Sequence, residues 1–167
     1  MVKQGSTIDA GDGIYSFIPL LKKHLLLRCP KRIVEWGSGM STILMATECP
    51  EAEIITLESD MDWFLYWARQ FRDFRNIKLY PLKVEANYVE AALGMGKFDM
   101  AFVDGVDTTR PACIEVAAKV LNPDGCCVVH DTERQEYWLQ INKYFRVVDE
   151  SERKWNSHTT VFELKKE

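Results

Sequence analysis

The sequence has no long apolar segment, no C-x-x-C pair, no internal repeat and no low-complexity linker. Its apolar runs, such as residues 25–27, are broken by His or charged residues well before the roughly 20 residues that a membrane span requires. Its 5 cysteines are odd in number and follow no secretory leader, which favours a reducing cytoplasm over a disulfide-bonded secreted fold. The sequence therefore predicts a single cytoplasmic domain over residues 1–167, without a membrane partner.

The sequence also lacks a strong excess of charge of either sign. There are 21 Lys and Arg against 25 Asp and Glu, a net charge of −4, and the basic residues are scattered along the chain. Nucleic acid usually requires a basic stripe, so nucleic acid is disfavoured as a partner. Hydrophobic residues make up 47% of the chain, which is enough for a globular core and too many for a disordered segment.

What the sequence does contain is an alternation of short β-branched runs with helically spaced apolar residues. The predicted strands are residues 32–36, 53–58, 77–82, 98–104, 126–130, 145–148 and 159–164. The predicted helices are residues 14–27, 40–48, 60–74, 84–93, 110–121 and 133–143. Parallel strands need a long crossover between them, so this order predicts an α/β, Rossmann-like three-layer sandwich. The last two strands are expected to complete a seven-stranded, mostly parallel sheet as an antiparallel hairpin.

Functional residues are expected where the predicted parallel strands end. Ligands of open parallel sheets bind beyond the carboxyl ends of the strands, where the strand order reverses. At these ends the sequence places residues 35–39 (Glu-Trp-Gly-Ser-Gly), 58–60 (Glu-Ser-Asp), 104–105 (Asp-Gly) and 130–132 (His-Asp-Thr). Each acid taken alone is as readily explained as a helix cap or a turn residue, but their joint placement favours a ligand site.

The glycine turn after the first predicted strand is suited to a nucleotide-like ligand. Gly37 and Gly39 let the backbone approach a ligand closely and present amide groups at the start of a helix. A dinucleotide-binding turn would continue to a third glycine, but Thr42 stands there, which disfavours an NAD-dependent oxidoreductase. Glu58, about twenty residues further on, can accept hydrogen bonds from ribose hydroxyls. Together these residues predict an adenosine-like ligand.

These segments resemble the class I S-adenosylmethionine-dependent methyltransferases over nearly the whole chain. The matching segments are residues 34–42, 55–58, 98–105 and 121–125, and Phe-Asp-x-x-Phe-Val-Asp-Gly is similar to the small-molecule O-methyltransferase branch. The resemblance implies that the glycine loop holds the methionine part of S-adenosylmethionine, Glu58 the ribose, and residues near Glu85 the adenine edge. The expected cofactor contacts are Glu35, Gly37, Ser38, Gly39, Ser41, Glu58, Ser59, Glu85, Ala86 and Asp104.

Asp104, His130 and Asp131 are the predicted catalytic residues, and two mechanisms stay open for them. Neighbouring parallel strands lie about 4.8 Å apart, so Asp104 and Asp131 could share Mg²⁺ or another divalent cation. Metal-dependent relatives add an amide or carboxylate ligand beside the second aspartate, where this sequence has Thr132. In a metal-free mechanism, Asp104 orients the cofactor or the acceptor and His130 takes the proton. A purely structural, hydrogen-bonded His130 is the competing interpretation.

Aromatic residues gather between residues 63 and 74, and their helical spacing predicts a core face in preference to a ligand-stacking surface. Trp36 either shapes the cofactor pocket or covers the sheet edge.

No substrate-covering insertion is visible in the sequence. An open cleft, a homo-oligomer whose second subunit supplies a surface, and a large acceptor therefore all stay open. The predicted function is methyl transfer to an oxygen of a small-molecule acceptor, with a nitrogen acceptor next. The alternative is a cofactor-binding or inactive methyltransferase-like interaction module.

Overall fold

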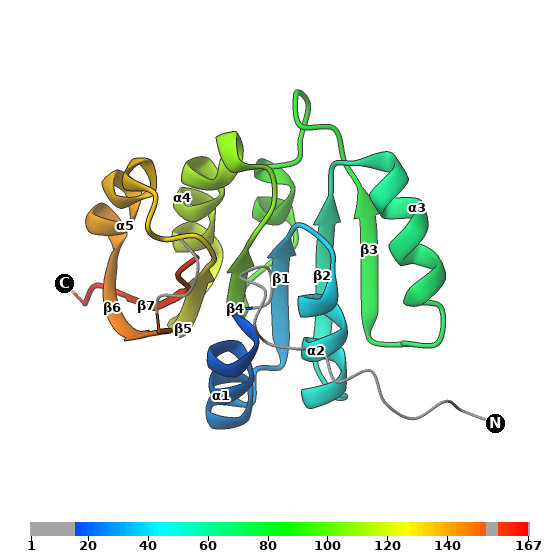
Figure 1. Cartoon of the computed structure of the whole chain (residues 1–167), viewed down its shortest axis with the longest axis horizontal. Helices are drawn as coiled ribbons and strands as arrows, with labels where there is room; N and C mark the ends of the chain where they lie inside the picture. The colour runs from blue at the N-terminus through cyan, green and yellow to red at the C-terminus, as the bar shows by residue number, and fades with distance from the viewer. Residues whose placement is uncertain (1–15, 153–156, 167) are drawn as a thin grey trace.

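The computed structural model describes residues 16–152 and 157–166. It consists of a seven-stranded sheet between two layers of helices (Figure 1). The strands are β1 (Arg32–Trp36), β2 (Glu53–Glu58), β3 (Ile77–Pro81), β4 (Phe98–Val103), β5 (Leu121–Val129), β6 (Phe145–Glu150) and β7 (Thr160–Leu164). Their order across the sheet is β3-β2-β1-β4-β5-β7-β6. The order reverses between β1 and β4, so the loops that follow these two strands meet at the same edge.

The first five strands are parallel, and β7 runs antiparallel to both β5 and β6. The predicted fold class is therefore confirmed, including the C-terminal antiparallel hairpin. Pro123, Asp124 and Gly125 lie within β5, where the register against β4 shifts between Phe98 and Met100. From Cys126 onward β5 pairs with β4 in continuous register, and this part corresponds to the predicted strand that begins at Cys126.

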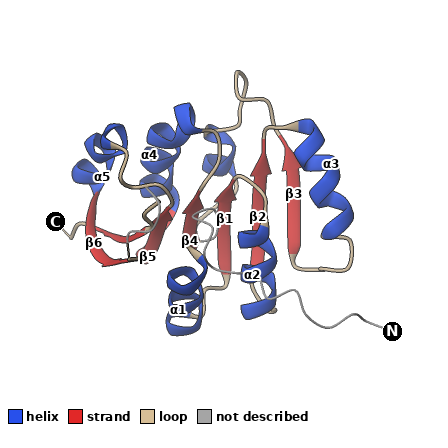
Figure 2. Ribbon diagram, viewed as in Figure 1, coloured by secondary structure: helices blue, strands red, loops and turns tan. Residues whose placement is uncertain are grey.

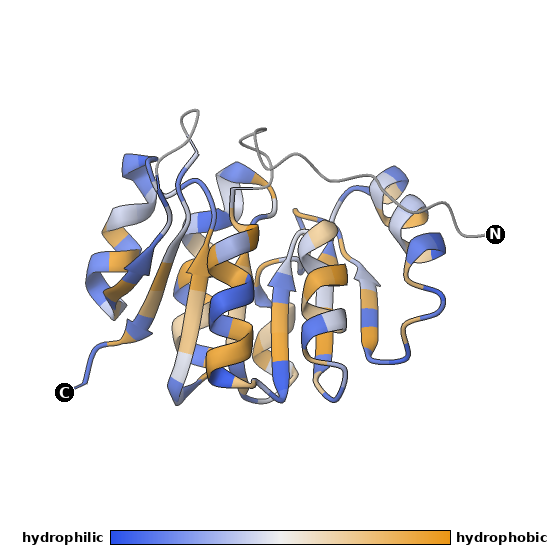
Figure 3. Cartoon of the chain, turned by 60° about the horizontal axis from the view of Figure 1, so that its bottom comes forward, coloured by the Kyte–Doolittle hydropathy of each residue, from blue (hydrophilic) through white to orange (hydrophobic). Residues whose placement is uncertain are grey.

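The helices cover both faces of the sheet (Figure 2). They are α1 (Ile18–Arg28), α2 (Met40–Glu48), α3 (Met61–Gln70), α4 (Arg110–Val120) and α5 (Trp138–Tyr144), with short 3₁₀ turns η2 (Glu90–Gly94), η3 (Asp107–Thr109) and η4 (Gln135–Tyr137). Apolar residues of α1 and α2 pack on one face, and those of α4 and α5 pack on the other. Hydrophobic residues predominate in the central strands (Figure 3). The longest of these helices have 11 residues, so no helix in the described ranges is long enough to cross a membrane.

The predicted helix over residues 84–93 is wrong for most of its length. The chain instead turns tightly, because the amides of residues 86–88 all donate to the carbonyl of Lys83 at 3.1–3.2 Å, and only the short η2 follows. Tyr88 is fully buried, and its carbonyl accepts a hydrogen bond from Trp36 Nε1 at 3.2 Å. This long-range contact holds the segment in a turn, which residue spacing alone does not reveal.

The helix predicted over residues 133–143 begins later than expected, at Trp138. The amide of Thr132 donates to the carbonyl of His158 at 2.8 Å, and Arg134 is extended. The C-terminal hairpin therefore holds the chain after β5 away from helical geometry. The predicted helix start at residue 14 lies outside the described residues, and α1 is seen from Ile18.

Candidate functional site

A cleft of about 890 Å³ opens at the carboxyl ends of β1, β2 and β4. Its lining comes from the three loops that follow these strands and from the start of α3. The lining residues are Gly37, Ser38, Met40, Glu58, Ser59, Asp60, Asp62, Trp63, Tyr66, Trp67, Asp104, Gly105, Val106 and Asp107. Five of the predicted cofactor contacts thus share this cleft, and one of them, Asp104, is also a predicted catalytic residue. A neighbouring hollow of about 220 Å³ adds Gly39 and Ser41.

Gly37 brings two of these loops into contact. Its φ of +95° lies in the left-handed region, and its amide donates to the carbonyl of Leu57 at 2.9 Å. A Cβ at this position would lie 2.8 Å from the carbonyl oxygen of Asp104 and 2.8 Å from the Cα of Gly105. The glycine is therefore required for the loop after β1 to pack against the loop after β4.

Glu58 lies at the cleft wall and accepts four hydrogen bonds. The amide of Ser38 at 2.9 Å and the Ser38 hydroxyl at 2.7 Å bind Oε2. The amides of Ser59 at 2.7 Å and Asp60 at 2.9 Å bind Oε1. The carboxylate is thus held rigidly in place. All four acceptor sites of the carboxylate are filled, and the Ser38 hydroxyl is the one side-chain donor that a ribose hydroxyl would replace.

Glu35 lies beneath the glycine loop and does not line the cleft. Its side chain is fully buried, and the hydroxyls of Ser41, Thr42 (2.6 Å) and Thr56 (2.8 Å) hydrogen-bond its carboxyl group. Burial raises the pKa of Glu35 to about 8, although the three hydroxyls oppose this shift. Its position does not support the predicted direct cofactor contact. It supports the start of α2 from below.

Replacing Glu35 with Gln is expected to remove a pH dependence of stability. The folded chain keeps the Glu35 proton up to about pH 8, whereas an unfolded chain loses it near the ordinary value of 4.5. The stabilisation is therefore complete below pH 4.5 and is lost as the pH rises to 8. Between pH 5 and pH 8, the free energy of unfolding of the wild type should fall by about 3–4 kcal/mol relative to Glu35→Gln.

Urea denaturation at several pH values measures this difference. Glu51→Gln, at an exposed position, is the matched control and should parallel the wild type. Parallel profiles for Glu35→Gln and the wild type would show that Glu35 is ionised in the folded protein.

Glu85 and Ala86 are not brought to the cleft. Both are exposed in the turn that replaces the predicted helix, and neither is among the residues that line the cleft. Their predicted contact with the adenine edge is therefore not supported by this structure. The register of this loop depends on the buried Tyr88, which lies beyond the predicted contacts in the chain.

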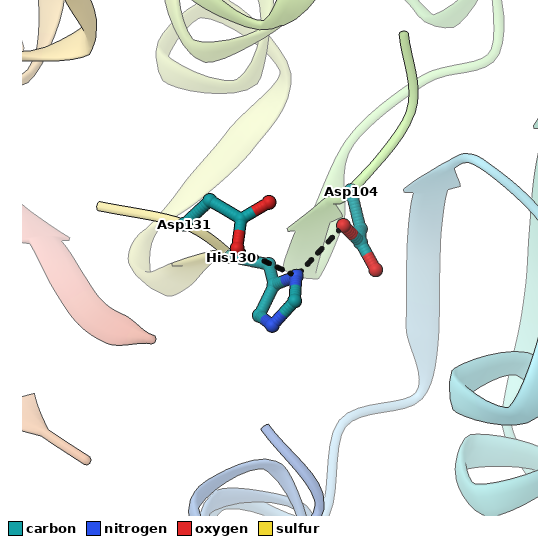
Figure 4. A group of neighbouring side chains, drawn as sticks. All are labelled: Asp104, His130 and Asp131. Atoms are coloured by element: carbon teal, nitrogen blue, oxygen red, sulfur yellow. Dashed lines mark hydrogen bonds and ion pairs between the residues drawn. The ribbon is translucent and has the colours of Figure 1, made fainter. Parts of the chain in front are cut away.

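Asp104, His130 and Asp131 do converge, because β4 and β5 are neighbours and end at the same edge (Figure 4). His130 Nδ1 lies 3.0 Å from Asp104 Oδ1 and 3.5 Å from Asp131 Oδ1. His130 Nε2 lies 3.0 Å from the Ser157 hydroxyl and 3.3 Å from that of Ser16. Both ring nitrogens are thus engaged, and His130 is buried.

The pKa of His130 reflects two opposing effects. Burial by itself lowers it, but the hydrogen bond and the charge of Asp104, together with Asp131, raise it above its usual value. Of the three predicted catalytic residues, only Asp104 lines the cleft. Asp104 is therefore placed to contact a ligand, whereas His130 and Asp131 lie behind it.

Arg110 is a member of this cluster that residue spacing did not predict. It is the first residue of α4, and its guanidinium lies 3.0 Å from Asp104 Oδ1 and 2.8 Å from Asp131 Oδ2. The position of Arg110 at the start of a predicted helix is a signal in the sequence. A positive charge there is unfavourable to the helix dipole, so an acidic partner is expected nearby. Burial would lower the pKa of Arg110, but the charges of Asp104 and Asp131 raise it.

The aromatic residues between 63 and 74 divide between the interior and the cleft. The prediction of a core face is confirmed for Trp67 and Phe71, which are buried, whereas Trp63 and Tyr66 line the cleft. Only Trp67 among the α3 residues is buried, whereas Trp63 and Tyr66 are 48% and 51% exposed. The indole of Trp63 donates from Nε1 to the carbonyl of Ser38 at 2.7 Å. Helical periodicity identifies an apolar face, but it does not distinguish a face turned to the core from one turned to a cleft.

No protein-family model matches the sequence, and no curated protein sequence matches it. Solved structures are similar in fold. The O-methyltransferase from Bacillus cereus in complex with S-adenosylhomocysteine has a TM-score of 0.74 at 15% identity, over 95% of this chain and 84% of that one. The precorrin-6y C5,15-methyltransferase from Geobacter metallireducens has a TM-score of 0.73 at 15% identity, over 96% and 94%. The N-methyltransferase NodS from Bradyrhizobium japonicum has a TM-score of 0.71 at 12% identity, over 95% and 100%. The chain therefore has the fold shared by these methyltransferases.

Proposed function

We propose that this protein is an S-adenosylmethionine-dependent methyltransferase. The observation that carries the proposal is the geometry of Glu58, a fixed hydroxyl acceptor at the wall of a cleft beside the glycine loop. The same fold holds S-adenosylhomocysteine in the B. cereus enzyme. The chain thus has a methyltransferase-like fold, and its cleft, with Glu58 in the wall, lies where the strand order reverses.

The residues of the cleft suit a cation such as the methyl donor. When bound, S-adenosylmethionine supplies a methyl group on a positively charged sulfur, and its leaving group needs no protonation. The charged residues of the described lining are all acidic: Glu58, Asp60, Asp62, Asp104 and Asp107. Gly37, Ser38, Gly39 and Ser59 would hold the cofactor beside Glu58, and Asp104 would orient its amino group or the acceptor. The chain itself contributes alignment of the two reactants.

The acceptor is proposed to be a small molecule that is neutral or positively charged and has an apolar or aromatic part. Trp63, Tyr66 and Val106 supply the apolar surface of the cleft. The carboxylates would repel phosphate groups, so a phosphorylated acceptor or a nucleic acid fits poorly. The resemblance of residues 98–105 to small-molecule O-methyltransferases favours oxygen as the acceptor atom, with nitrogen second.

Calorimetric titration with S-adenosylmethionine and S-adenosylhomocysteine tests the proposal. Micromolar binding, about −8 kcal/mol, is expected for at least one of them. An acceptor panel of phenols, amines and their phosphorylated counterparts should then give turnover only with the compounds that lack phosphate. If neither cofactor binds, the inactive interaction module becomes the better interpretation of the chain.

A further inference from the structure

The buried guanidinium of Arg110 lies among the acidic residues Asp104, Asp107 and Asp131. Arg110 is only 6% exposed, and its guanidinium bridges the carboxylates that end β4 and β5. Asp104, His130 and Asp131 each offer one ligand atom, all within 4.8 Å of one another, as in a divalent cation site. The two predicted metal ligands, Asp104 and Asp131, therefore lie close together, but the group between their carboxylates is the guanidinium of Arg110.

The guanidinium is anchored on all three of its nitrogens. Nε donates to the carbonyl of Gly105 at 2.8 Å. Nη1 donates to Asp131 and, at 3.3 Å, to the carbonyl of His130, while Nη2 contacts Asp104 and, at 3.2 Å, Asp107 Oδ1. Swinging this side chain out would break contacts to the loops after both strands at once. The Arg110 side chain is therefore fixed in place between the two loops.

A divalent cation does not fit beside this guanidinium. Mg²⁺ prefers carboxylate and water oxygens in an octahedral arrangement, and the facing carboxylate oxygens already accept from Arg110. A doubly charged ion there would also lie next to a fixed, buried positive charge. Arg110 and the predicted metal are therefore alternative occupants of the same place.

We propose that Arg110 permanently replaces the divalent cation, so that this site binds no metal. Arg110 is then a positioning residue that holds the Asp104 carboxylate at the cleft through Oδ1. The exclusion of metal stands independently of the proposed function, whereas the effect of Arg110 on substrate rests on it. In this arrangement the cofactor and acceptor meet a carboxylate of fixed orientation and no Lewis acid.

Binding of Mn²⁺, followed by its electron paramagnetic resonance signal, tests the exclusion directly. The wild type should take up no stoichiometric Mn²⁺ at concentrations up to about 1 mM. Arg110→Ala empties the place between the carboxylates and should bind one Mn²⁺, and Arg110→Ala/Asp131→Asn should bind none. Stoichiometric Mn²⁺ in the wild type that Asp131→Asn abolishes would overturn the proposal. So would a folded Arg110→Ala that binds no Mn²⁺.

Rescue by a metal separates positioning from simple structural support. Mn²⁺ should raise the thermal unfolding midpoint of Arg110→Ala and leave that of the wild type unchanged. Arg110→Lys, which retains the charge, should keep more of the S-adenosylmethionine affinity than Arg110→Ala, and Mn²⁺ should restore affinity to the latter only. If the wild type binds no cofactor, the proposed function fails while the Mn²⁺ result still decides the exclusion of metal. If Arg110→Ala does not fold, the wild-type titration decides it alone.

Discussion

Gly37→Ala is expected to lower the free energy of unfolding by about 4 kcal/mol. The added Cβ would meet three backbone atoms of Asp104 and Gly105 at 2.8–2.9 Å, and backbone cannot move aside as a flexible side chain can. The φ of +95° adds strain for any residue with a side chain. Together, strain and overpacking account for an effect of this size.

Gly39→Ala is the matched control two residues away. The nearest heavy atom to a Cβ there is the Ser41 hydroxyl at 4.0 Å, and the φ of Gly39 is 173°, which is ordinary extended backbone. This variant should change stability by less than about 1 kcal/mol. Guanidinium denaturation of both variants measures the contrast. Equal stability of the two would mean that the loops after β1 and β4 are not packed as described.

Glu58→Ala should abolish measurable cofactor binding, which we place at a loss of at least about 100-fold, or about 2.7 kcal/mol. The substitution removes the acceptor assigned to the ribose. It also leaves the amides of Ser38, Ser59 and Asp60 without their partner, so the glycine loop and the start of α3 lose their common anchor. Calorimetric titration with S-adenosylhomocysteine gives the affinity, and denaturation gives the accompanying loss of stability.

Ser38→Ala separates the ribose role of Glu58 from its role as an anchor. This change removes the hydroxyl that now binds Oε2 and retains the Ser38 amide. Its effect on affinity should be at least about tenfold smaller than that of Glu58→Ala, because a ribose hydroxyl can take the vacated place on the carboxylate. Wild-type affinity in Glu58→Ala would show that the assignment of the ribose site is wrong.

The predicted cluster of Asp104, His130 and Asp131 could be found from the sequence because parallel topology is regular. Once β4 and β5 are recognised as neighbours, the residues after them must share one edge of the sheet. The glycine loop and Glu58 could be predicted from the sequence for the same reason. Each of these predictions depends only on the order of strands and on which residue ends each strand.

The features that residue spacing did not reveal depend on contacts between distant residues. The resemblance implied Glu85 and Ala86 as contacts to the adenine edge, but the buried Tyr88 and its contact with Trp36 hold that segment in a turn outside the cleft lining. His130 was expected either to take a proton or to act structurally, and the hydroxyl of Ser157 beside Nε2 comes from the chain before β7. Contacts across such distances in the chain leave no local pattern.

Local residue patterns were enough to predict the order of the elements, the glycine loop and the row of acids at the strand ends. Period-2 and period-3.6 patterns and turn residues encode these features locally. Long-range packing, in contrast, puts Arg110 between Asp104 and Asp131, buries Glu35 below the loop and turns Trp63 to the cleft. The direction of a long side chain is set by the charges and surfaces that folding brings to it, and these come from strands far apart in the chain.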